Sequence, residues 1–286
     1  MQRSLLTIKE LTEGYLQEKG VPNPKLESDL LIAHVLGMQR LDLYLNFDRP
    51  ISAKERDRLR PMVKRRGQRE PLQYILGYHD FCDCRLKVDP RALIPRPETE
   101  QLMERIVQSL AEPPAHILDL GTGSGAIILA LQKQYPAAQC TAVDVSHAAL
   151  DLAQENERSV LEAPSIEWIQ SDWWSNIETG KQYDLIVSNP PYLTKEELET
   201  AAPEVRQFEP HSALVSGAEG LHALRAIFEQ LHRRLLPDGL CFLETGIDQE
   251  SALQGACQQA GLQGQSYPDL SGRTRFFKVL KSKASL

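Results

Sequence analysis

The sequence predicts an α/β protein in which a mainly parallel sheet, covered by helices on both faces, follows a small helical domain. From about residue 115 onward, apolar segments of strand length alternate with helical segments, which is typical of such sheets. A glycine-rich loop follows the first of these strands, and an Asn-Pro-Pro-Tyr motif follows a later one. The first 70 residues lack this alternation and show helix-capping patterns instead.

The amino-terminal part of the chain carries the signals of helices. Thr7 with Glu10, and Ser52 with Glu55, have the spacing of capping boxes and predict two helix starts. Apolar residues recur at helical spacing over residues 26–36. We therefore expect a helical domain over residues 1–70.

The pattern changes twice after this domain. Residues 71–100 contain short alternating segments and a turn at Asp89 and Pro90, so we expect a β-hairpin linker there. Residues 101–286 then form the larger α/β domain. Its predicted strands share a short apolar run bounded by turn residues, and they are His116–Leu120, Thr141–Val145, Ile166–Ile169, Leu185–Ser188, Leu240–Leu243 and Arg275–Val279.

Composition excludes several classes of protein. With 286 residues, 42% of them apolar, the chain can bury a sizeable core. It has no run of 18 apolar residues, and Glu10 and Glu13 interrupt the segment where a signal peptide would lie. We therefore expect a cytoplasmic protein without a membrane span. Five cysteines without a C-x-x-C pair indicate neither a disulfide framework nor a metal site.

The charge is unevenly distributed along the chain. Residues 1–70 carry 14 Lys and Arg against 10 Asp and Glu, a net +4, and the remainder carries 18 against 29, a net −11. Much of the positive charge lies between residues 54 and 69. A solvated helix face is the favoured interpretation of this stretch, with a contact surface for RNA or a ribosome-associated partner as the alternative.

The loop after the first strand is a candidate cofactor site. Glycines at this place permit a sharp turn and let a ligand approach the backbone. The G-x-G-x-G spacing differs from that of dinucleotide binders and resembles the nucleotide loop of class I S-adenosylmethionine-dependent methyltransferases. The candidate cofactor-binding residues of this loop are Asp119, Gly121, Thr122, Gly123, Ser124 and Gly125.

Polar residues at the ends of the next strands complete this candidate site. Asp144 follows the second strand, where an acid can accept hydrogen bonds from both ribose hydroxyls. Asp172, after the third strand, can accept from an adenine amino group, and Trp173 offers an apolar face for the ring. Asn189 follows the fourth strand and is the last of these polar strand-end residues.

The motif Asn189-Pro190-Pro191-Tyr192 suggests a pocket for a planar NH2 group. The Asn189 side-chain oxygen and the Pro190 carbonyl can each accept one N–H bond, and Tyr192 can lie against the plane. We expect Asn189, Pro190 and Tyr192 to act in catalysis and all four residues to bind the substrate. A glutamine amide and an exocyclic adenine amine both fit this chemistry, and a strand-ending turn without function is the simplest alternative.

Motifs along nearly the whole chain resemble the PrmC/HemK family, whose members methylate the glutamine of the Gly-Gly-Gln motif in peptide-chain release factors. These motifs are Pro71–Gly77, Phe81, Leu93–Glu100, the glycine loop, Asn189–Tyr192, Glu209-Pro210, Ala213-Leu214, Gly220-Leu221, Glu244–Gly246 and Arg273. The resemblance implies a Rossmann-like seven-stranded sheet, S-adenosylmethionine as cofactor, the donor and substrate residues named above, and contact of Asn189 with the cofactor as well as with the substrate. It also implies that the helical domain takes part in partner recognition.

Two related activities remain as alternatives. Ribosomal-protein glutamine methyltransferases typically carry Pro-Arg-Ser-Pro where this chain has Pro95–Glu100, which favours release factors as substrates. Adenine-N6 methylation of nucleic acid is supported by the basic stretch, but the acidic charge of the larger domain weighs against it. A donor-binding module without activity is a third possibility. We expect a monomer that binds release factors but neither a membrane nor, stably, nucleic acid.

Overall fold

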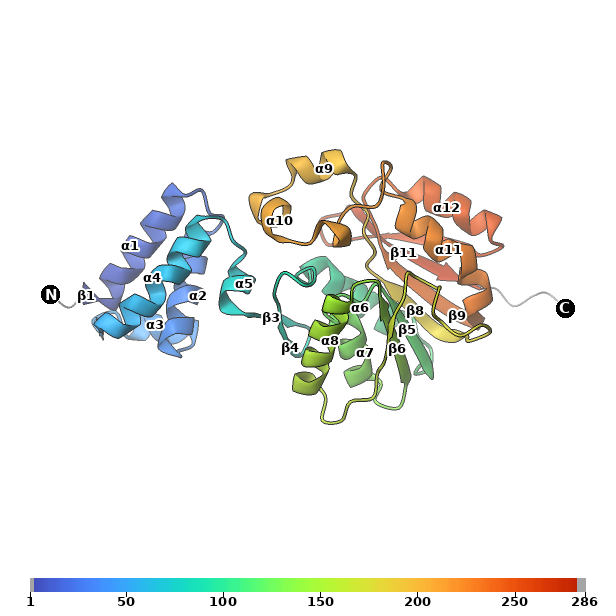
Figure 1. Cartoon of the computed structure of the whole chain (residues 1–286), viewed down its shortest axis with the longest axis horizontal. Helices are drawn as coiled ribbons and strands as arrows, with labels where there is room; N and C mark the ends of the chain where they lie inside the picture. Colours follow the sequence, from blue (N-terminus) through green and yellow to red (C-terminus); the bar gives the residue numbers. More distant parts are fainter. Residues whose placement is uncertain (1–2, 282–286) are drawn as a thin grey trace. The chain divides into compact units, whose positions relative to one another are not determined.

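The computed structural model describes residues 3–281, which pack into two compact units. The helical unit comprises the residues up to Gly77 together with Ala202–Phe208, and the sheet unit comprises Tyr78–Ala201 and the residues from Glu209 onward (Figure 1). The boundaries expected from the sequence, after residues 70 and 100, differ from this division. The ends of the two expected outer domains, residues 1–2 and 282–286, lie outside the described residues.

The helical unit is built from short helices and one two-stranded ribbon. Its elements are β1 (Arg3–Ser4), α1 (Leu5–Glu18), α2 (Pro24–Leu36), α3 (Arg40–Leu45), β2 (Pro50–Ile51), α4 (Ala53–Gly67), α5 (Leu72–Leu76) and α10 (Pro203–Phe208). Its core includes the fully buried side chains of Leu5, Leu16, Leu31 and Leu43. Helix α5 packs against α2 and α4, which is why it belongs to this unit.

One of the two predicted capping boxes is confirmed and the other is wrong. The Ser52 hydroxyl accepts from the backbone N–H of Glu55, and the Glu55 carboxylate accepts from the backbone N–H of Ser52. Helix α1, however, begins at Leu5, because the Ser4 hydroxyl caps it by accepting from the backbone N–H of Thr7. Thr7 therefore lies inside the first turn.

A buried ion pair joins α1 to α2. Lys9 Nζ lies 2.8 Å from Asp29 Oδ1, and the two side chains are 6% and 2% exposed. The Tyr44 hydroxyl accepts from Lys9 at 3.2 Å and donates to Asp29 Oδ2 at 2.7 Å. Burial alone would lower the pKa of Lys9, but its bonds to Asp29 and Tyr44 and the charge of Asp29 raise it overall.

The basic stretch between residues 54 and 69 is partly used inside the helical unit. Arg66 is only 2% exposed and forms ion pairs with Glu27 and Glu204. Arg69 makes two hydrogen bonds of 2.7 Å to the same Glu204 carboxylate. The solvated helix face expected from the sequence therefore does not include Arg66, whose charge is neutralised by acidic neighbours.

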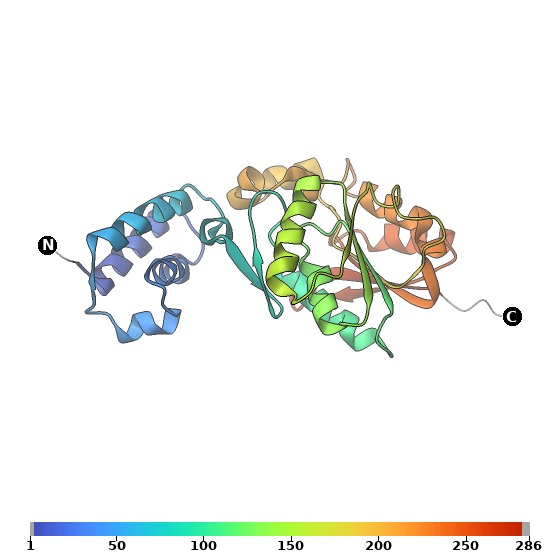
Figure 2. The ribbon, with the colours of Figure 1, turned by 60° about the horizontal axis from the view of Figure 1, so that its bottom comes forward.

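The sheet unit has its helices on both faces of one large sheet. Its elements are β3 (Tyr78–Phe81), β4 (Cys84–Lys87), α6 (Pro97–Ser109), β5 (His116–Leu120), α7 (Ala126–Gln134), β6 (Gln139–Asp144), α8 (His147–Val160), β7 (Glu167–Gln170), β8 (Tyr183–Ser188), α9 (Lys195–Thr200), η1 (His211–Ala213), α11 (His222–Arg234), β9 (Leu235–Glu244), α12 (Glu250–Gln259), β10 (Gln263–Pro268) and β11 (Thr274–Leu280). Figures 1 and 2 show α7 and α8 on one face and α11 and α12 on the other.

The seven strands of this sheet have the order β10-β11-β9-β8-β5-β6-β7. β5 pairs in parallel with both β6 and β8, whereas β11 and β10 run antiparallel to their neighbours. The strand order reverses beside β5, and open α/β sheets bind ligands at such a reversal, outside the carboxyl ends of the strands. The predicted mostly parallel, seven-stranded sheet is confirmed.

Successive residues of the central strands point into two different cores. On β5, Ile117 packs in the core that contains α6 and α7, and Leu118 packs in the core that contains α11 and α12. On β8, Leu185 and Ile186 divide in the same way. Both faces of the sheet are therefore covered by apolar side chains and shielded from water, which explains why these strands are continuous apolar runs in the sequence.

The six strands predicted in this unit are confirmed; β5 has the predicted ends, and the ends of the other five shift by at most five residues. β10 was not predicted, because Gln263, Gln265 and Ser266 give this edge strand a polar sequence without an apolar run. The expected hairpin is present as β3 and β4. Phe81 and Leu86 from this hairpin are fully buried in the core beneath α6 and α7, so the hairpin is part of the sheet unit.

Across residues 3–281, no helix has the combination of length and apolar content that spanning a bilayer would require.

We predict that Lys9→Met lowers the free energy of unfolding by about 3–5 kcal/mol, because it leaves the Asp29 carboxylate buried without its cation. Chemical denaturation followed by circular dichroism measures this loss. Arg85→Met is a suitable control, since it breaks an ion pair with Asp80 whose side chains are 65% and 59% exposed, and it should cost about 1 kcal/mol or less. Equal losses in the two variants would contradict the prediction.

Candidate active site

The glycine loop turns sharply between β5 and α7. Gly121, Gly123 and Gly125 have φ values of 72°, 56° and 81°, in the left-handed region that favours glycine. A Cβ on Gly125 would also lie 3.1 Å from the Cβ of Ala153 and 3.2 Å from Leu129. Conformation and space therefore both require glycine at position 125, where the loop packs against α7 and α8, whereas Gly121 and Gly123 line a cavity.

The carboxylate of Asp144, at the end of β6, is fixed against this loop. Its Oδ2 accepts from the backbone N–H of Gly123 and its Oδ1 from the backbone N–H of Ser146, both at 2.9 Å. Burial raises the pKa of Asp144, although hydrogen bonds from backbone N–H groups oppose the rise. Both oxygens retain lone pairs that can accept bonds from a diol.

Trp173 and Asp172 lie in the turn after β7, and both line the same cavity as the glycine loop. Trp173 has a φ of 49°, which is unusual for a bulky residue. Its ring lies over Gly121, since a Cβ built there would be 3.7 Å from the ring. Asp172 is exposed at the cavity edge.

The Asn-Pro-Pro-Tyr motif follows β8 directly. The Ser188 hydroxyl donates to the Leu120 carbonyl at 2.6 Å, which ties the end of β8 to the end of β5. Asn189 and Pro191 line the cavity, and Pro190 is buried. The Asn189 Nδ2 donates to the hydroxyl of Thr99 at 3.2 Å, so its Oδ1 remains available on the other side of the amide group.

Tyr192 is held at both its hydroxyl and its backbone. The hydroxyl lies 3.4 Å from Glu244 Oε1 and 3.4 Å from Arg275 Nη1. Burial and the nearby charge of Glu244 raise the pKa of this hydroxyl. The Gln249 amide donates to the carbonyl of Tyr192 at 3.2 Å and to that of Gly220 at 2.9 Å.

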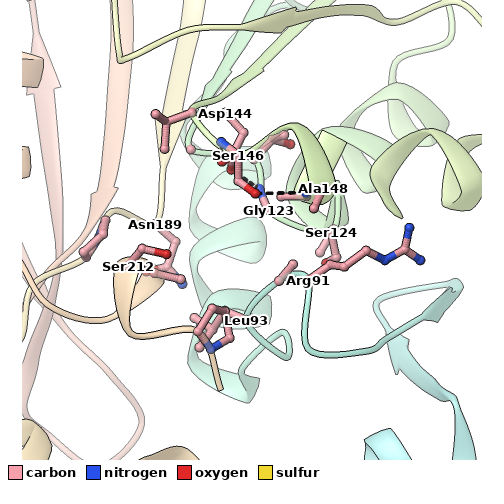
Figure 3. A pocket seen from close by; sticks show the side chains of 18 of the residues that line it. Arg91, Leu93, Gly123, Ser124, Asp144, Ser146, Ala148, Asn189 and Ser212 are labelled. Carbon is pink, nitrogen blue, oxygen red and sulfur yellow. Dashed lines mark hydrogen bonds between the residues drawn. The ribbon is translucent and has the colours of Figure 1, made fainter. Parts of the chain in front are cut away.

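These motifs surround a single cavity of about 530 Å³, a volume typical of ligand pockets. Figure 3 shows side chains from the glycine loop, the end of β6 and the end of β8 around it, with the bond between Gly123 and Asp144 among the dashed lines. The sequence prediction missed part of the wall, namely Pro90, Arg91, Ala92, Leu93, Pro95, Thr99, Ala126, Ile127, Val145, Ser146, Ala148, Ala149, Ser171, Pro210, Ser212 and Ala213.

An ion pair holds two of these missed wall segments together. Arg96 Nη2 donates to both carboxylate oxygens of Glu209, at 2.8 and 2.7 Å. The Glu209 side chain is 1% exposed, and burial raises its pKa while the charge and bonds of Arg96 oppose the rise. Both residues lie in motifs noted in the sequence, but no local pattern indicated that they pair.

Asp119 occupies a different position from the other predicted cofactor residues. It is fully buried beneath the loop, where its Oδ2 accepts from the hydroxyl of Thr122 at 2.7 Å. Burial raises the pKa of Asp119 to about 7. This geometry gives Asp119 a role in shaping the loop, and direct contact with a cofactor stays a prediction.

Asn156 is a further residue that sequence reasoning missed. It is fully buried on α8, and its Nδ2 donates to the carbonyls of Ser124 at 2.9 Å and Lys87 at 3.1 Å. Its Oδ1 accepts from the backbone N–H of Lys87 at 2.7 Å. Asn156 thus connects the glycine loop to the hairpin, and nothing in its sequence context distinguishes it from a helix surface residue.

Comparisons with known proteins identify the family. Residues 10–77 match the model of the PrmC N-terminal domain, and residues 98–214 match that of the methyltransferase small domain. The chain is 40% identical over 254 residues to a release factor glutamine methyltransferase of Geobacter sulfurreducens, covering 89% of this chain and 88% of the relative. The chain belongs to the release factor glutamine methyltransferase family. A member from Rhodopirellula baltica is 33% identical over 290 residues, covering 98% of this chain and 97% of that relative.

A solved structure supports the fold independently. A 16S rRNA methyltransferase of T. thermophilus, in complex with AdoMet and guanosine, superposes with a TM-score of 0.52 at 18% identity, covering 72% of this chain and 50% of that one. The fold of the sheet unit is therefore that of a class I methyltransferase. Family membership makes the chain a methyltransferase that uses S-adenosylmethionine as its methyl donor.

We predict that Gly220→Ala lowers the rate of methyl transfer and reduces the free energy of unfolding by about 1–3 kcal/mol. Gly220 has a φ of 70°, and a Cβ there would lie 2.3 Å from the carbonyl oxygen of Tyr192. Thermal unfolding and methyl-transfer assays measure both effects. Gly255→Ala is the matched control, because its Cβ meets nothing within 4 Å inside α12. It should stabilise the protein by about 0.5–1 kcal/mol, and similar losses in both variants would be inconsistent with this account.

We also predict a pH dependence of stability that originates at Asp119. Its pKa of about 7 lies above the value of roughly 3.9 in an unfolded chain. Between these values the folded state holds a proton that the unfolded state has lost, so this group's contribution to stability falls as pH rises from about 4 to 7.

Asp119→Asn should remove this contribution. Relative to wild type, the free energy of unfolding of the variant should rise with pH over this window, by up to about 1.4 kcal/mol per pH unit. Denaturation curves at several pH values test this, and the slope rather than the absolute difference is the readout. Parallel pH profiles for the two proteins would refute it.

Proposed function

We propose that this chain transfers a methyl group from S-adenosylmethionine to the side-chain nitrogen, N5, of the glutamine in the Gly-Gly-Gln motif of peptide-chain release factors. The names of the relatives support this substrate. The observation that carries the proposal is Asn189, which lines the cavity and directs its Nδ2 to Thr99. Its Oδ1 is then the acceptor for an incoming amide N–H.

Two features of the cavity support binding of S-adenosylmethionine there. Gly121, without a side chain, leaves the Trp173 ring accessible as a flat apolar surface for adenine. The Asp144 carboxylate is already oriented by two backbone bonds and would accept from the ribose hydroxyls. When bound, S-adenosylmethionine supplies a methyl group made electrophilic by a positively charged sulfur.

The residues of the motif would act by positioning and electrostatics. A carboxamide nitrogen is a weak nucleophile because its lone pair is delocalised into the carbonyl group. The Asn189 oxygen and the Pro190 carbonyl would hold its two N–H bonds and stabilise the positive charge that develops on nitrogen. Correct orientation can supply roughly 7–11 kcal/mol of the barrier. No strong general base is needed, because a cationic, methylated nitrogen loses its proton readily.

Adenine-N6 methylation of nucleic acid is a weaker candidate. It relies on the basic residues 54–69, of which Arg66 and Arg69 already bind Glu204 within the helical unit. The part of the chain after residue 70 is acidic, whereas a nucleic-acid cleft usually presents basic side chains. A ribosomal-protein glutamine would use the same amide chemistry, so substrate trials must include it.

The helical unit is the part of the chain that we assign to recognition of the release factor. Its sequence matches a model defined for this family rather than for methyltransferases in general. A monomer in the cytoplasm is the state in which we expect the enzyme to meet its substrate.

We predict that Asn189→Ala lowers methyl transfer by about 100-fold or more, because it removes a preorganised hydrogen-bond acceptor. Mass spectrometry of the Gly-Gly-Gln peptide of a release factor, after incubation with enzyme and S-adenosylmethionine, measures the product. Isothermal titration should show donor binding largely retained.

Gln254→Ala serves as a control, since Gln254 is an exposed residue of α12 outside the cavity lining, and its amide donates to the carbonyl of Gly264. It should methylate the peptide at the wild-type rate. Wild-type turnover by Asn189→Ala would exclude the proposed role of this residue. An unmodified release factor in the wild-type reaction, with a methylated ribosomal protein or DNA, would instead exclude the proposed substrate.

A further inference from the structure

The Glu-Thr-Gly motif at the end of β9 is not used by the mechanism described so far. Its first residue, Glu244, is 1% exposed, and each of its carboxylate oxygens faces a different hydroxyl. Oε2 accepts from Thr99 at 2.7 Å, and Oε1 lies 3.4 Å from the hydroxyl of Tyr192. A single buried carboxylate thus contacts Tyr192 directly and reaches Asn189 through Thr99.

The hydrogen bond between Thr99 and Glu244 determines how Thr99 can face Asn189. A threonine hydroxyl has one proton, and the 2.7 Å bond to Glu244 uses it. The Thr99 oxygen can therefore only accept a hydrogen bond from Asn189. Asn189 must therefore direct its NH2 group toward Thr99, and its Nδ2 does donate to the Thr99 hydroxyl oxygen at 3.2 Å.

The opposite amide orientation would be unsuitable for the reaction. It would direct the Asn189 NH2 group toward the cavity, where it would meet the N–H bonds of a substrate amide, donor against donor. A buried donor left without an acceptor is costly. The orientation of one side-chain amide therefore decides whether the cavity accepts or rejects an NH2 group.

We propose that Thr99 and Glu244 are positioning residues that set the orientation of the Asn189 amide. This inference rests on the proposed function, because it concerns the same amide-binding site. Glu244 orients Thr99, Thr99 orients Asn189, and Glu244 holds Tyr192 at the other end of the motif. Thr99 comes from the first turn of α6 and Glu244 from β9, so the arrangement depends on three separate parts of the chain.

Thr99→Val tests the role of Thr99 with almost no change of shape. It removes the hydroxyl that Asn189 faces, so kcat/KM for the release factor should fall by about 100-fold, with the affinity for S-adenosylmethionine within about twofold of wild type. Thr99→Ser restores the hydroxyl and should recover most of the loss. Thr200→Val is the matched control, because its hydroxyl donates to the carbonyl of Glu197 on exposed α9. Equal turnover by the valine and serine variants at position 99 would overturn the inference.

Glu244→Gln tests whether the two residues act as a unit. A glutamine has one acceptor oxygen for two hydroxyls, so this variant should also lose activity. The double variant Thr99→Val/Glu244→Gln should be no worse than Glu244→Gln alone, since residues in one network are not additive. Multiplied losses would overturn the inference, and the Thr99 pair keeps the test decisive if Glu244→Gln fails to fold.

A spectroscopic measurement separates this inference from the proposed substrate. The side-chain NH2 signals of Asn189 in a 15N-labelled protein, assigned by their absence in Asn189→Ala, report its hydrogen bond without any substrate. They should shift in Thr99→Val and stay close to wild type in Thr99→Ser and Thr200→Val. Unchanged signals in Thr99→Val would refute the positioning role. An inactive wild-type enzyme with the expected shift would instead refute the release factor as substrate while keeping the positioning role.

Discussion

The parallel pairing of β5 with β8 is the constraint on which the whole site depends. Ile117 lies opposite Leu185 and Asp119 opposite Val187, so the two strands end at the same edge of the sheet. The bond from Ser188 to the Leu120 carbonyl fixes their ends together. The glycine loop and Asn189 therefore follow neighbouring strand ends and line one cavity, so the strand register brings the proposed donor and acceptor sites together.

Buried polar groups give this site its detailed geometry. A charge removed from water must be paired or hydrogen-bonded, and removing one partner of a buried ion pair costs about 3–5 kcal/mol. Glu209 is paired with Arg96, and Glu244 with the hydroxyls of Thr99 and Tyr192. Each of these carboxylates joins segments that are far apart in the sequence. The cavity walls are therefore specified by the need to satisfy hydrogen bonds rather than by apolar packing alone.

Sequence reasoning succeeded where a feature has a local signature. The glycine loop, Asp144 and the Asn-Pro-Pro-Tyr motif each follow a recognisable strand, and Gly121–Ser124, Asp144, Asn189 and Pro191 line one cavity. The sheet was predicted for the same reason, except for the polar edge strand β10. Capping was predicted correctly at Ser52 but not at Thr7, because Ser4 competes for the same helix end.

The remaining parts of the site depend on pairs that no local pattern reveals. Thr99 and Glu244 are 145 residues apart, and Arg96 and Glu209 are 113 apart. Each residue lies in a family motif, yet its partner follows only from the folded topology. Tyr192 is an example of what the sequence could not show. Its place beside a substrate stays a prediction, whereas the structure directs its hydroxyl toward Glu244.

The packing of α10 has a consequence for how this protein can be divided. Residues Ala202–Phe208 belong to the helical unit, although the segments before and after them belong to the sheet unit. The polypeptide therefore passes between the units three times, and no single cut separates them. Removing the first 77 residues would leave Glu204 without its ion pairs to Arg66 and Arg69. A chimera that exchanges the first 77 residues between relatives would have to exchange this short internal segment as well.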